Sequence, residues 1–238
     1  HLAAVLGLRF VGVPLTAAFE LDMPAMCQAI EEHQPALVFI ASPNNPTGNR
    51  FADADLEVLA GLTPGLFVLD EAYIPYAGGD GRALARSYPQ VVLLRTLSKW
   101  GLAGLRLGFV QARGRVCEQL EKVRMPYNIN VLSQALGTLC LQHAEAFAEQ
   151  IQQLVRGREQ LTRELSADGV TVYPSAANFV LVRCRDARAT HAALKSQRIL
   201  VKLLHGAHPR LEQCLRISVG SPAENRALLE VWPEALQA

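Results

Sequence analysis

The chain has 238 residues, 50% of them hydrophobic, which is enough to bury the core of one or two domains. Its 23 basic and 22 acidic residues are spread along the sequence and give a formal net charge of +1. The chain therefore lacks the strongly basic charge of proteins that bind nucleic acids or membrane surfaces. No apolar run approaches the roughly 18 residues of a membrane span, so we expect neither nucleic acid nor a membrane as a partner.

The five cysteines and six histidines predict neither a disulfide framework nor a metal site. The cysteines are odd in number, widely scattered and without a Cys-x-x-Cys motif, and the histidines lack the spacing of metal ligands. We therefore expect reduced thiols, no bound metal and a cytoplasmic location.

Residues 1–6 resemble the middle of a helix that leads into a strand at residues 10–14. They resemble no signal peptide, because no basic region precedes an apolar stretch. Asp22 is expected to cap a helix through His33, and Asp53 is expected to cap another over residues 55–62.

Three apolar runs in the first half predict buried strands, and each ends in polar residues. The runs are residues 36–41, 66–69 and 91–94. Helical segments between them imply right-handed crossovers and a largely parallel sheet, whose carboxyl ends lie along one ligand-binding edge. We expect six side chains to converge there: Asn45, Asp70, Tyr73, Ser98, Lys99 and Arg106.

Each of these residues also has a plainer interpretation when it is taken alone. Lys99 could equally be a surface charge, and Asn45 an ordinary turn residue. Asp70 could cap a helix or be a buried carboxylate with a cationic partner. Arg216 alternates with apolar neighbours, which fits either an exposed strand position or a contact with an anion.

The second half is expected to change from long helices to a small α/β unit. Residues 114–122 predict a helix, and residues 131–165 predict mostly helix, weakly interrupted at Gly137 and Gly157 and ended by a turn at Asp168–Gly169. Strands are then predicted at 170–173, 178–183, 199–204 and 214–219, with helices at 187–196 and from Ser221–Pro222 onward.

Three motifs occur in order: Ser-Pro-Asn-Asn-Pro-Thr-Gly at 42–48, Asp-Glu-Ala-Tyr at 70–73, and Thr-Leu-Ser-Lys followed by Gly-Leu-Ala-Gly-Leu-Arg at 96–106. Together they resemble the motifs of the fold-type-I aminotransferases that use pyridoxal 5'-phosphate (PLP), and within them those of the histidinol-phosphate aminotransferases. The resemblance extends to Arg-Ile-Ser-Val-Gly at 216–220. It implies a mostly parallel sheet flanked by helices as a large PLP-binding domain over 1–145, and a bridging helix with a small C-terminal α/β domain over 146–238.

The resemblance also assigns roles to individual residues. Lys99 would form the Schiff base with PLP and then move the substrate's proton. Asp70 would face the pyridinium nitrogen, and Tyr73 and Asn45 would lie near the ring oxygen. Ser98, Arg106 and Thr96 would hold the phosphate. The resemblance further suggests a cis peptide bond between Asn45 and Pro46.

Two positions concern the phosphate and the substrate. Arg106 follows Lys99 by seven residues, where many relatives have eight, so the turn between them is expected to differ. Arg216 would grip a substrate carboxylate, and Lys202 matches a position where the family often has an arginine that contacts the substrate phosphate.

The resemblance implies transamination of histidinol phosphate with 2-oxoglutarate in L-histidine biosynthesis, by a homodimer. Because relatives are longer on the N-terminal side, the chain is expected to be incomplete there. An aromatic aminotransferase or a threonine-phosphate decarboxylase is the alternative among enzymes. A non-catalytic PLP-binding domain of a transcription regulator is the alternative of a different class.

Overall fold

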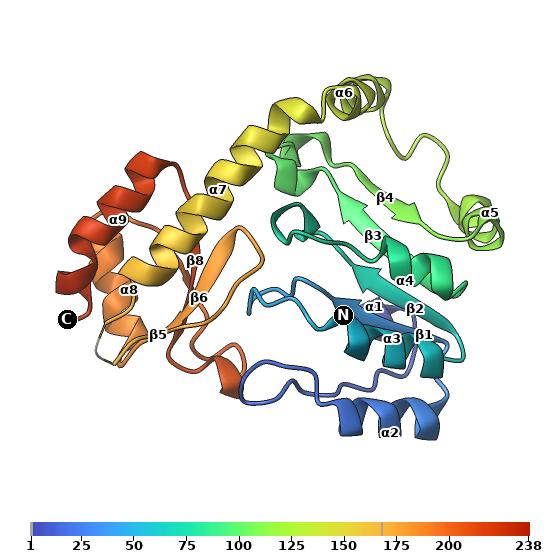
Figure 1. Ribbon diagram of the computed structural model, residues 1–238, viewed down its shortest axis with the longest axis horizontal. Coiled ribbons are helices and arrows are strands. Elements are labelled where there is room, and N and C mark those ends of the chain that lie inside the picture. Colours follow the sequence, from blue (N-terminus) through green and yellow to red (C-terminus); the bar gives the residue numbers. More distant parts are fainter. Residues whose placement is uncertain (1, 168) are drawn as a thin grey trace.

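The computed structural model describes residues 2–167 and 169–238, and within them the strands form two four-stranded sheets (Figure 1). The first sheet has the order β1-β2-β3-β4, with bounds Leu37–Ala41, Leu66–Asp70, Val91–Thr96 and Gly108–Gln111. The second has the order β5-β6-β8-β7, with bounds Thr171–Val172, Phe179–Arg183, Cys214–Ser218 and Lys202–Leu203. The predicted α/β architecture is confirmed.

In the first sheet, β1, β2 and β3 are parallel, as predicted, and β4 joins β3 antiparallel. Helices α2 (Met23–His33), α3 (Asp53–Leu62) and α4 (Arg82–Ser87) supply the apolar partners of one sheet face. The core there includes Ile30, Leu59, Phe67, Leu69 and Leu93. Because side chains alternate along a strand, the polar residues at the strand ends can face away from this core.

The opposite face of β1 is largely open to solvent. Leu37 and Phe39 are 52% and 60% exposed, while Val38 and Ile40 between them are buried. The strand predicted over residues 10–14 is wrong: these residues form no strand, and Phe10 is 80% exposed. A β-branched or aromatic run becomes a strand only where a neighbouring strand can pair with it. In the described part of the chain, no strand pairs with residues 10–14. Helix α1 is limited to Leu2–Val5, and His1 lies outside the described residues.

In the second sheet all pairs are antiparallel. Helices α7 (Glu145–Glu164), α8 (Ala187–Ser196) and α9 (Pro222–Ala235) pack on one side of it around a core that includes Leu161, Leu194, Leu215, Ile217 and Trp232. The indole Nε1–H of Trp232 donates to the carbonyl of Leu165 at 3.1 Å, so its one polar atom is paired in the core.

Several helix ends follow from single side chains. Asp22 accepts the Ala25 N–H at 3.2 Å, as predicted. Ser221 caps α9 in a reciprocal capping box with Glu224. The predicted cap at Asp53 is wrong, because Asp53 is the first residue of α3 and pairs with Arg50 at 2.5 Å instead. An acidic side chain in the first turn is favourable there without serving as the cap.

The helical region after β4 is divided at a different place from that predicted. It consists of α5 (Gly114–Val123), α6 (Val131–Gln142) and α7, with a break at residues 143–144 and none at Gly137 or Gly157. One half of the predicted turn at Asp168–Gly169 lies outside the described residues; Gly169 has a φ of 79°. Helix α7 then extends from the β3–β4 end of the first sheet to helices α8 and α9 on the second (Figure 1).

Candidate functional site

The polar segments that follow β1, β2 and β3 lie side by side, because the parallel hydrogen-bond ladder continues past the strand ends. The Ser42 N–H donates to Asp70 O at 3.0 Å, and the Glu71 N–H donates to Leu94 O at 2.8 Å. The sequence motifs at 42–48, 70–73 and 96–106 therefore begin at one edge of the sheet. This is the edge where open α/β sheets bind ligands.

The turn that bears Asn45 packs against the second sheet. Its Ser42–Pro43 and Asn45–Pro46 peptide bonds are cis, the second as predicted. Gly48 adopts a φ of 84°, and a Cβ added there would lie 2.6 Å from the Ser175 hydroxyl oxygen. Only glycine fits this approach, which fixes the Asn45 turn next to the segment leading into β6.

Lys99 lies in the short 3-10 turn Ser98–Trp100, with its amine against an aromatic surface. Its Nζ is 4.9 Å from the ring centroid of Tyr73. The Tyr73 ring is buried and meets Phe179 edge to face, with centroids 5.2 Å apart. The Tyr76 hydroxyl donates to the Lys99 carbonyl, so both the backbone and the side chain of Lys99 are held.

Asp70 is half-buried at the end of β2, and its Oδ1 accepts the Ala72 N–H at 2.9 Å. Among the described residues, no lysine or arginine forms an ion pair with it. A half-buried carboxylate without a cation at the carboxyl end of a parallel strand is available to a cationic group of a ligand.

The residues proposed for the phosphate differ in how firmly they are held. Thr96 Oγ1 donates to Leu107 O at 2.9 Å and accepts the Ser98 N–H at 3.0 Å, which braces the turn ahead of Lys99. Its hydroxyl also lies 3.0 Å from that of Ser98. Arg106 follows the 3-10 turn Ala103–Leu105 with a φ of 54° and an exposed side chain. The structure therefore brings the two hydroxyls together and leaves Arg106 at the solvent side of the turn.

Arg216 reaches from the second sheet to the first. Its Nη1 donates to Asn45 Oδ1 at 2.6 Å, and its guanidinium carbon lies 5.0 Å from the ring centroid of Phe179. Its Nε is buried and has no hydrogen-bond partner within the described part of the chain. Lys202 stands directly opposite Arg216 in the β7–β8 ladder, so both side chains emerge on the same sheet face.

Glu71 and Arg95 form an ion pair that sequence reasoning missed. Glu71 is 1% exposed, and its Oε2 accepts Arg95 Nε at 2.8 Å and Nη2 at 2.7 Å. Burial raises the pKa of Glu71, although bonds from the Gly81 N–H and from Arg95 oppose the rise. The adjacent acids Asp70 and Glu71 at a strand end could have suggested a buried ion pair. The sequence could not identify Arg95 as the partner of Glu71, because that depends on the β2–β3 register.

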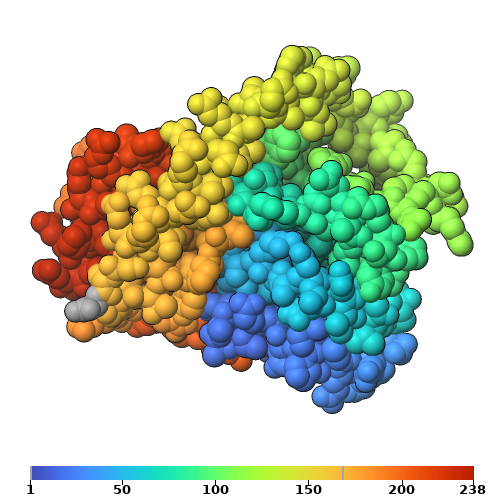
Figure 2. All heavy atoms as spheres, viewed as in Figure 1, coloured from blue at the N-terminus to red at the C-terminus, as the bar shows by residue number. Residues whose placement is uncertain are grey.

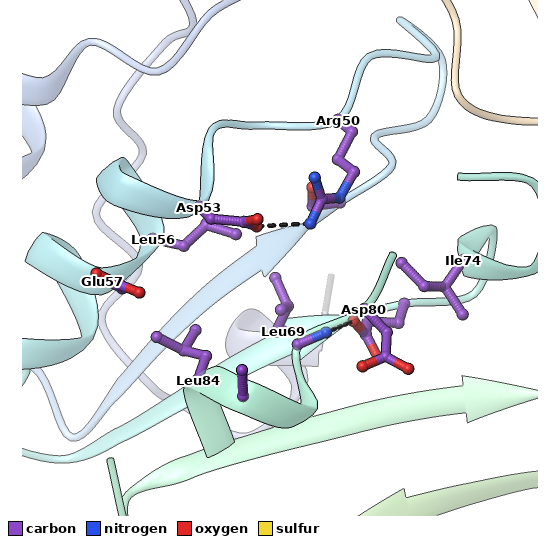
Figure 3. Close-up of a pocket in the computed structure, with 12 residues that line it drawn as sticks. Arg50, Asp53, Leu56, Glu57, Leu69, Ile74, Asp80 and Leu84 are labelled. Atoms are coloured by element: carbon purple, nitrogen blue, oxygen red, sulfur yellow. Dashed lines mark hydrogen bonds and ion pairs between the residues drawn. The ribbon is translucent and has the colours of Figure 1, made fainter. Parts of the chain in front are cut away.

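Two hollows border the first sheet, and Lys99 lines neither of them. The more enclosed, about 80 Å³, is on the helix-covered side of the first sheet, where Arg50, Asp53, Asp80 and Leu84 surround it (Figure 3). The wider, about 370 Å³, reaches Arg95, Thr96 and Trp100. Among the described residues that line them, Lys99, Asp70 and Tyr73 are missing. Of the described residues in the candidate site, the wider hollow reaches only Thr96, so the site is assigned by its reactive groups and not by these hollows.

Helix α7 contacts both the part of the chain that contains the first sheet and the part that contains the second. Helix α7 (yellow) abuts both the teal segments around β3 and the orange and red C-terminal segments (Figure 2). Arg158 of α7 joins them, because its Nη1 donates to Tyr76 O at 3.1 Å and to Ala177 O at 3.0 Å. Burial lowers the pKa of this guanidinium, with Glu159 opposing.

The collected groups are an amine, a carboxylate, a phenol, an amide, two hydroxyls and two guanidinium groups. They fit a ligand that has a carbonyl carbon, a basic ring nitrogen, an acidic ring hydroxyl and a phosphate. The unpartnered Nε of Arg216, in the described residues, fits an anion at the mouth of the site. In the same ranges, no three His, Cys, Asp or Glu side chains gather into a metal site. No helix of the described part is long and apolar enough to cross a membrane.

The sequence of this chain is similar to those of known aminotransferases. Residues 2–231 match the family described as "Aminotransferase class I and II". The protein named histidinol-phosphate aminotransferase 2 of Bordetella parapertussis is 49% identical over 234 residues, which are 97% of this chain and 64% of that relative. The chain thus spans less than two thirds of that relative's length.

Two solved structures have similar folds. The histidinol-phosphate aminotransferase of Sinorhizobium meliloti, in complex with pyridoxal-5'-phosphate, is 29% identical with a TM-score of 0.88, and the match covers 99% of this chain and 66% of that one. A decarboxylase from Sulfurospirillum multivorans is 27% identical with a TM-score of 0.86, covering 97% and 70%.

Proposed function

The chain belongs to the aminotransferase class I and II family, and on that premise we propose that it is part of a PLP-dependent enzyme that transaminates histidinol phosphate with 2-oxoglutarate. The products are imidazole-acetol phosphate and glutamate, and the reaction belongs to L-histidine biosynthesis. The proposal depends above all on the Lys99 amine, which lies 4.9 Å from the centroid of the buried Tyr73 ring at the edge shared with Asp70 and Asn45.

The residues of this edge would hold PLP as follows. The Lys99 amine would bind its aldehyde carbon, and the Asp70 carboxylate would pair with its ring nitrogen. Tyr73 and Asn45 would donate hydrogen bonds to its ring oxygen. The Ser98 and Thr96 hydroxyls and the Arg106 guanidinium would bind its phosphate. When bound, PLP supplies an electron sink for the bond broken at the substrate's Cα.

The chain's own residues perform the proton transfers. Asp70 would keep a proton on the ring nitrogen, because a carboxylate stabilises the protonated form of a facing base. The free Lys99 Nζ would accept the proton from the substrate's Cα and donate it to the carbon on the far side of the nitrogen, two atoms away. The Tyr76 hydroxyl donates to the Lys99 carbonyl and so would keep the Lys99 amine close to both carbons.

Arg216 and Lys202 are proposed to choose the substrate. A guanidinium fork suits the carboxylate of glutamate, and histidinol phosphate has no carboxylate at that end. Lys202, on the same sheet face, would meet the phosphate as a point charge. The name of the Bordetella parapertussis relative, at 49% identity, supports this choice of substrate.

The substrate is tested by comparing kcat/KM for histidinol phosphate and for phenylalanine, each with 2-oxoglutarate. We expect histidinol phosphate to be preferred. Lys202→Ala should lower kcat/KM for histidinol phosphate roughly 10- to 100-fold and leave that for phenylalanine unchanged, since a hydrogen bond to a charged group contributes about 1.5–3 kcal/mol. Lys195→Ala, at an exposed position of α8, is the control. Preference for phenylalanine, or no selective loss in Lys202→Ala, would leave only a general aminotransferase.

A decarboxylase is the second candidate, supported by the similar structure from Sulfurospirillum multivorans. Such an enzyme would use the same lysine and carboxylate but break a different bond at Cα. Carbon dioxide released from threonine phosphate, without glutamate formation from histidinol phosphate, would establish it.

We also propose that the protein forms a homodimer and is located in the cytoplasm. Each subunit would have a large domain over residues 1–145 and a small domain over residues 146–238. The exposed Phe39 of β1, and Leu132 and Leu136 of α6, support an apolar contact with a second copy. Light scattering during size-exclusion chromatography gives the mass: a dimer is expected, and a monomer at all concentrations would contradict the dimer.

A further inference from the structure

Glu71 lies directly after Asp70 but serves the opposite face of the sheet. Leu69, two residues before Glu71, and Leu93, two residues before Arg95, both belong to the helix-covered core. Glu71 and its partner Arg95 therefore point to the same side of the sheet as these leucines. Since side chains alternate along an extended chain, Asp70 points to the ligand face while Glu71 points away from it. Glu71 is 1% exposed, and its carboxylate lies on the side of the strand opposite the Asp70 side chain.

The Glu71 carboxylate nevertheless joins three segments. Its Oε2 accepts both Nε and Nη2 of Arg95, at 2.8 and 2.7 Å, and its Oε1 accepts the Gly81 N–H. Asp80 adds a second acceptor for Arg95 at 3.3 Å. A Cβ on Gly81 would lie 3.1 Å from Glu71 Oε1 and closer still to Leu69 and Leu93, so this loop packs directly on the ion pair.

Arg95 is four residues before Lys99, and the intervening backbone is braced. The Thr96 hydroxyl holds the Ser98 N–H and the Leu107 carbonyl, so a shift of the β3 end is passed to the turn that bears Lys99. At the other end, Glu71 is one peptide unit from Asp70, and its N–H is bonded to Leu94 O. The ion pair thus links the strand end that bears Asp70 to the strand end that leads to Lys99.

We propose that Glu71, through Arg95, is a positioning residue that sets the placement of Lys99 relative to Asp70. This rests on the proposed function of those two residues. Displacing the amine by about 1 Å from the position where it exchanges protons costs up to roughly 100-fold in rate. Glu71→Gln retains an acceptor for Gly81 but loses the charge that fixes the Arg95 fork.

The test uses four variants of the full chain: Glu71→Gln, Arg95→Gln, the double variant, and Asp53→Asn as control. The control breaks a different ion pair, Arg50–Asp53, which borders the same hollow as Glu71. For each variant we would measure the rate at which borohydride fixes PLP on Lys99, the pH midpoint of the absorbance of bound PLP, kcat and KM, and cooperative unfolding in urea.

We expect Glu71→Gln and Arg95→Gln to unfold cooperatively, as folded proteins do. In both variants Lys99 should be labelled more slowly, and the pH midpoint of the PLP absorbance should shift. The value of kcat should fall roughly 10- to 100-fold with little change in KM. The double variant should be no worse than either single variant, because both remove one interaction. Asp53→Asn should match the wild type. If Glu71→Gln does not fold, Arg95→Lys, which keeps a charge without the fork, is expected to give the same slowed labelling.

Folded variants that label Lys99 at the wild-type rate with an unshifted pH midpoint would overturn the positioning role alone. A wild-type protein that takes no label at Lys99 would overturn the proposed function, and the positioning role with it. The two failures are therefore distinguishable.

Discussion

Arg216 and Asn45, 171 residues apart in sequence, are joined by a hydrogen bond of 2.6 Å from Nη1 to Oδ1. The bond ties strand β8 of the second sheet to the turn after β1 of the first. It engages one nitrogen of the guanidinium, while Nε is buried with no partner in the described ranges. The arginine is thus already held at the site with part of its fork unused, which fits a residue that awaits an anion.

Arg216→Lys should weaken the use of glutamate far more than that of histidinol phosphate, because lysine has the charge but not the planar fork. We expect KM for glutamate to rise roughly 10- to 100-fold, as for the loss of a hydrogen bond to a charged group of about 1.5–3 kcal/mol. Steady-state kinetics with each amine measures it. Arg188→Lys, on the exposed side of α8, is the control, and equal losses for both amines would argue against a carboxylate contact.

Asp70→Asn should keep the fold but lose most transaminase activity. The amide oxygen can still accept the Ala72 N–H, so the local turn is preserved. The neutral side chain cannot keep a proton on the facing ring nitrogen, and breaking a buried charge pair costs about 3–5 kcal/mol in the bound state. Turnover and urea unfolding of the variant measure the two effects. Near-normal turnover would mean that Asp70 only shapes the turn.

The buried Glu71 gives a prediction for stability against pH. Burial raises its folded pKa above the ordinary value of 4.5, with the Gly81 N–H and Arg95 opposing. A raised pKa means that the folded state binds the proton more tightly than the unfolded state. The contribution of this group to stability is therefore full below about pH 4.5 and is lost as the pH rises through the raised value.

Glu71→Gln is neutral at every pH and removes this dependence. Urea unfolding at a series of pH values from 4 upward should show wild-type stability falling relative to that of Glu71→Gln as the pH rises. Wild-type stability that instead rises relative to the variant over the same range would mean that Arg95 and Gly81 outweigh burial and hold the folded pKa below its ordinary value.

The elements that sequence predicted correctly are those with a local cause. The runs that became β1, β2 and β3 are apolar and end in polar motifs, and the Ser221–Pro222 start of α9 has its capping residues within one turn. Strand β4 was missed because all four of its residues are exposed, so no alternation marks it. The break between α6 and α7 at residues 143–144 was missed because these residues, His143 and Ala144, include no glycine or proline that would predict a helix end.

The site was predictable as a set of residues but not as a set of contacts. Parallel strands bring Asn45, Asp70 and Lys99 to one edge whatever the details of packing. The Glu71–Arg95 pair needs the register in which Asp70 stands opposite Leu94, and the Arg216–Asn45 bond needs the position of one sheet against the other. Neither is encoded in a short stretch of sequence.

The central claim, that Lys99 is the residue that binds PLP, is tested most directly by borohydride reduction of the protein with PLP, followed by peptide mapping. Reduction fixes the cofactor on the lysine that holds it, so the labelled peptide identifies that residue without any assay of turnover. The account predicts label on Lys99 alone, and label on Lys122, Lys195 or Lys202 in its place would contradict it.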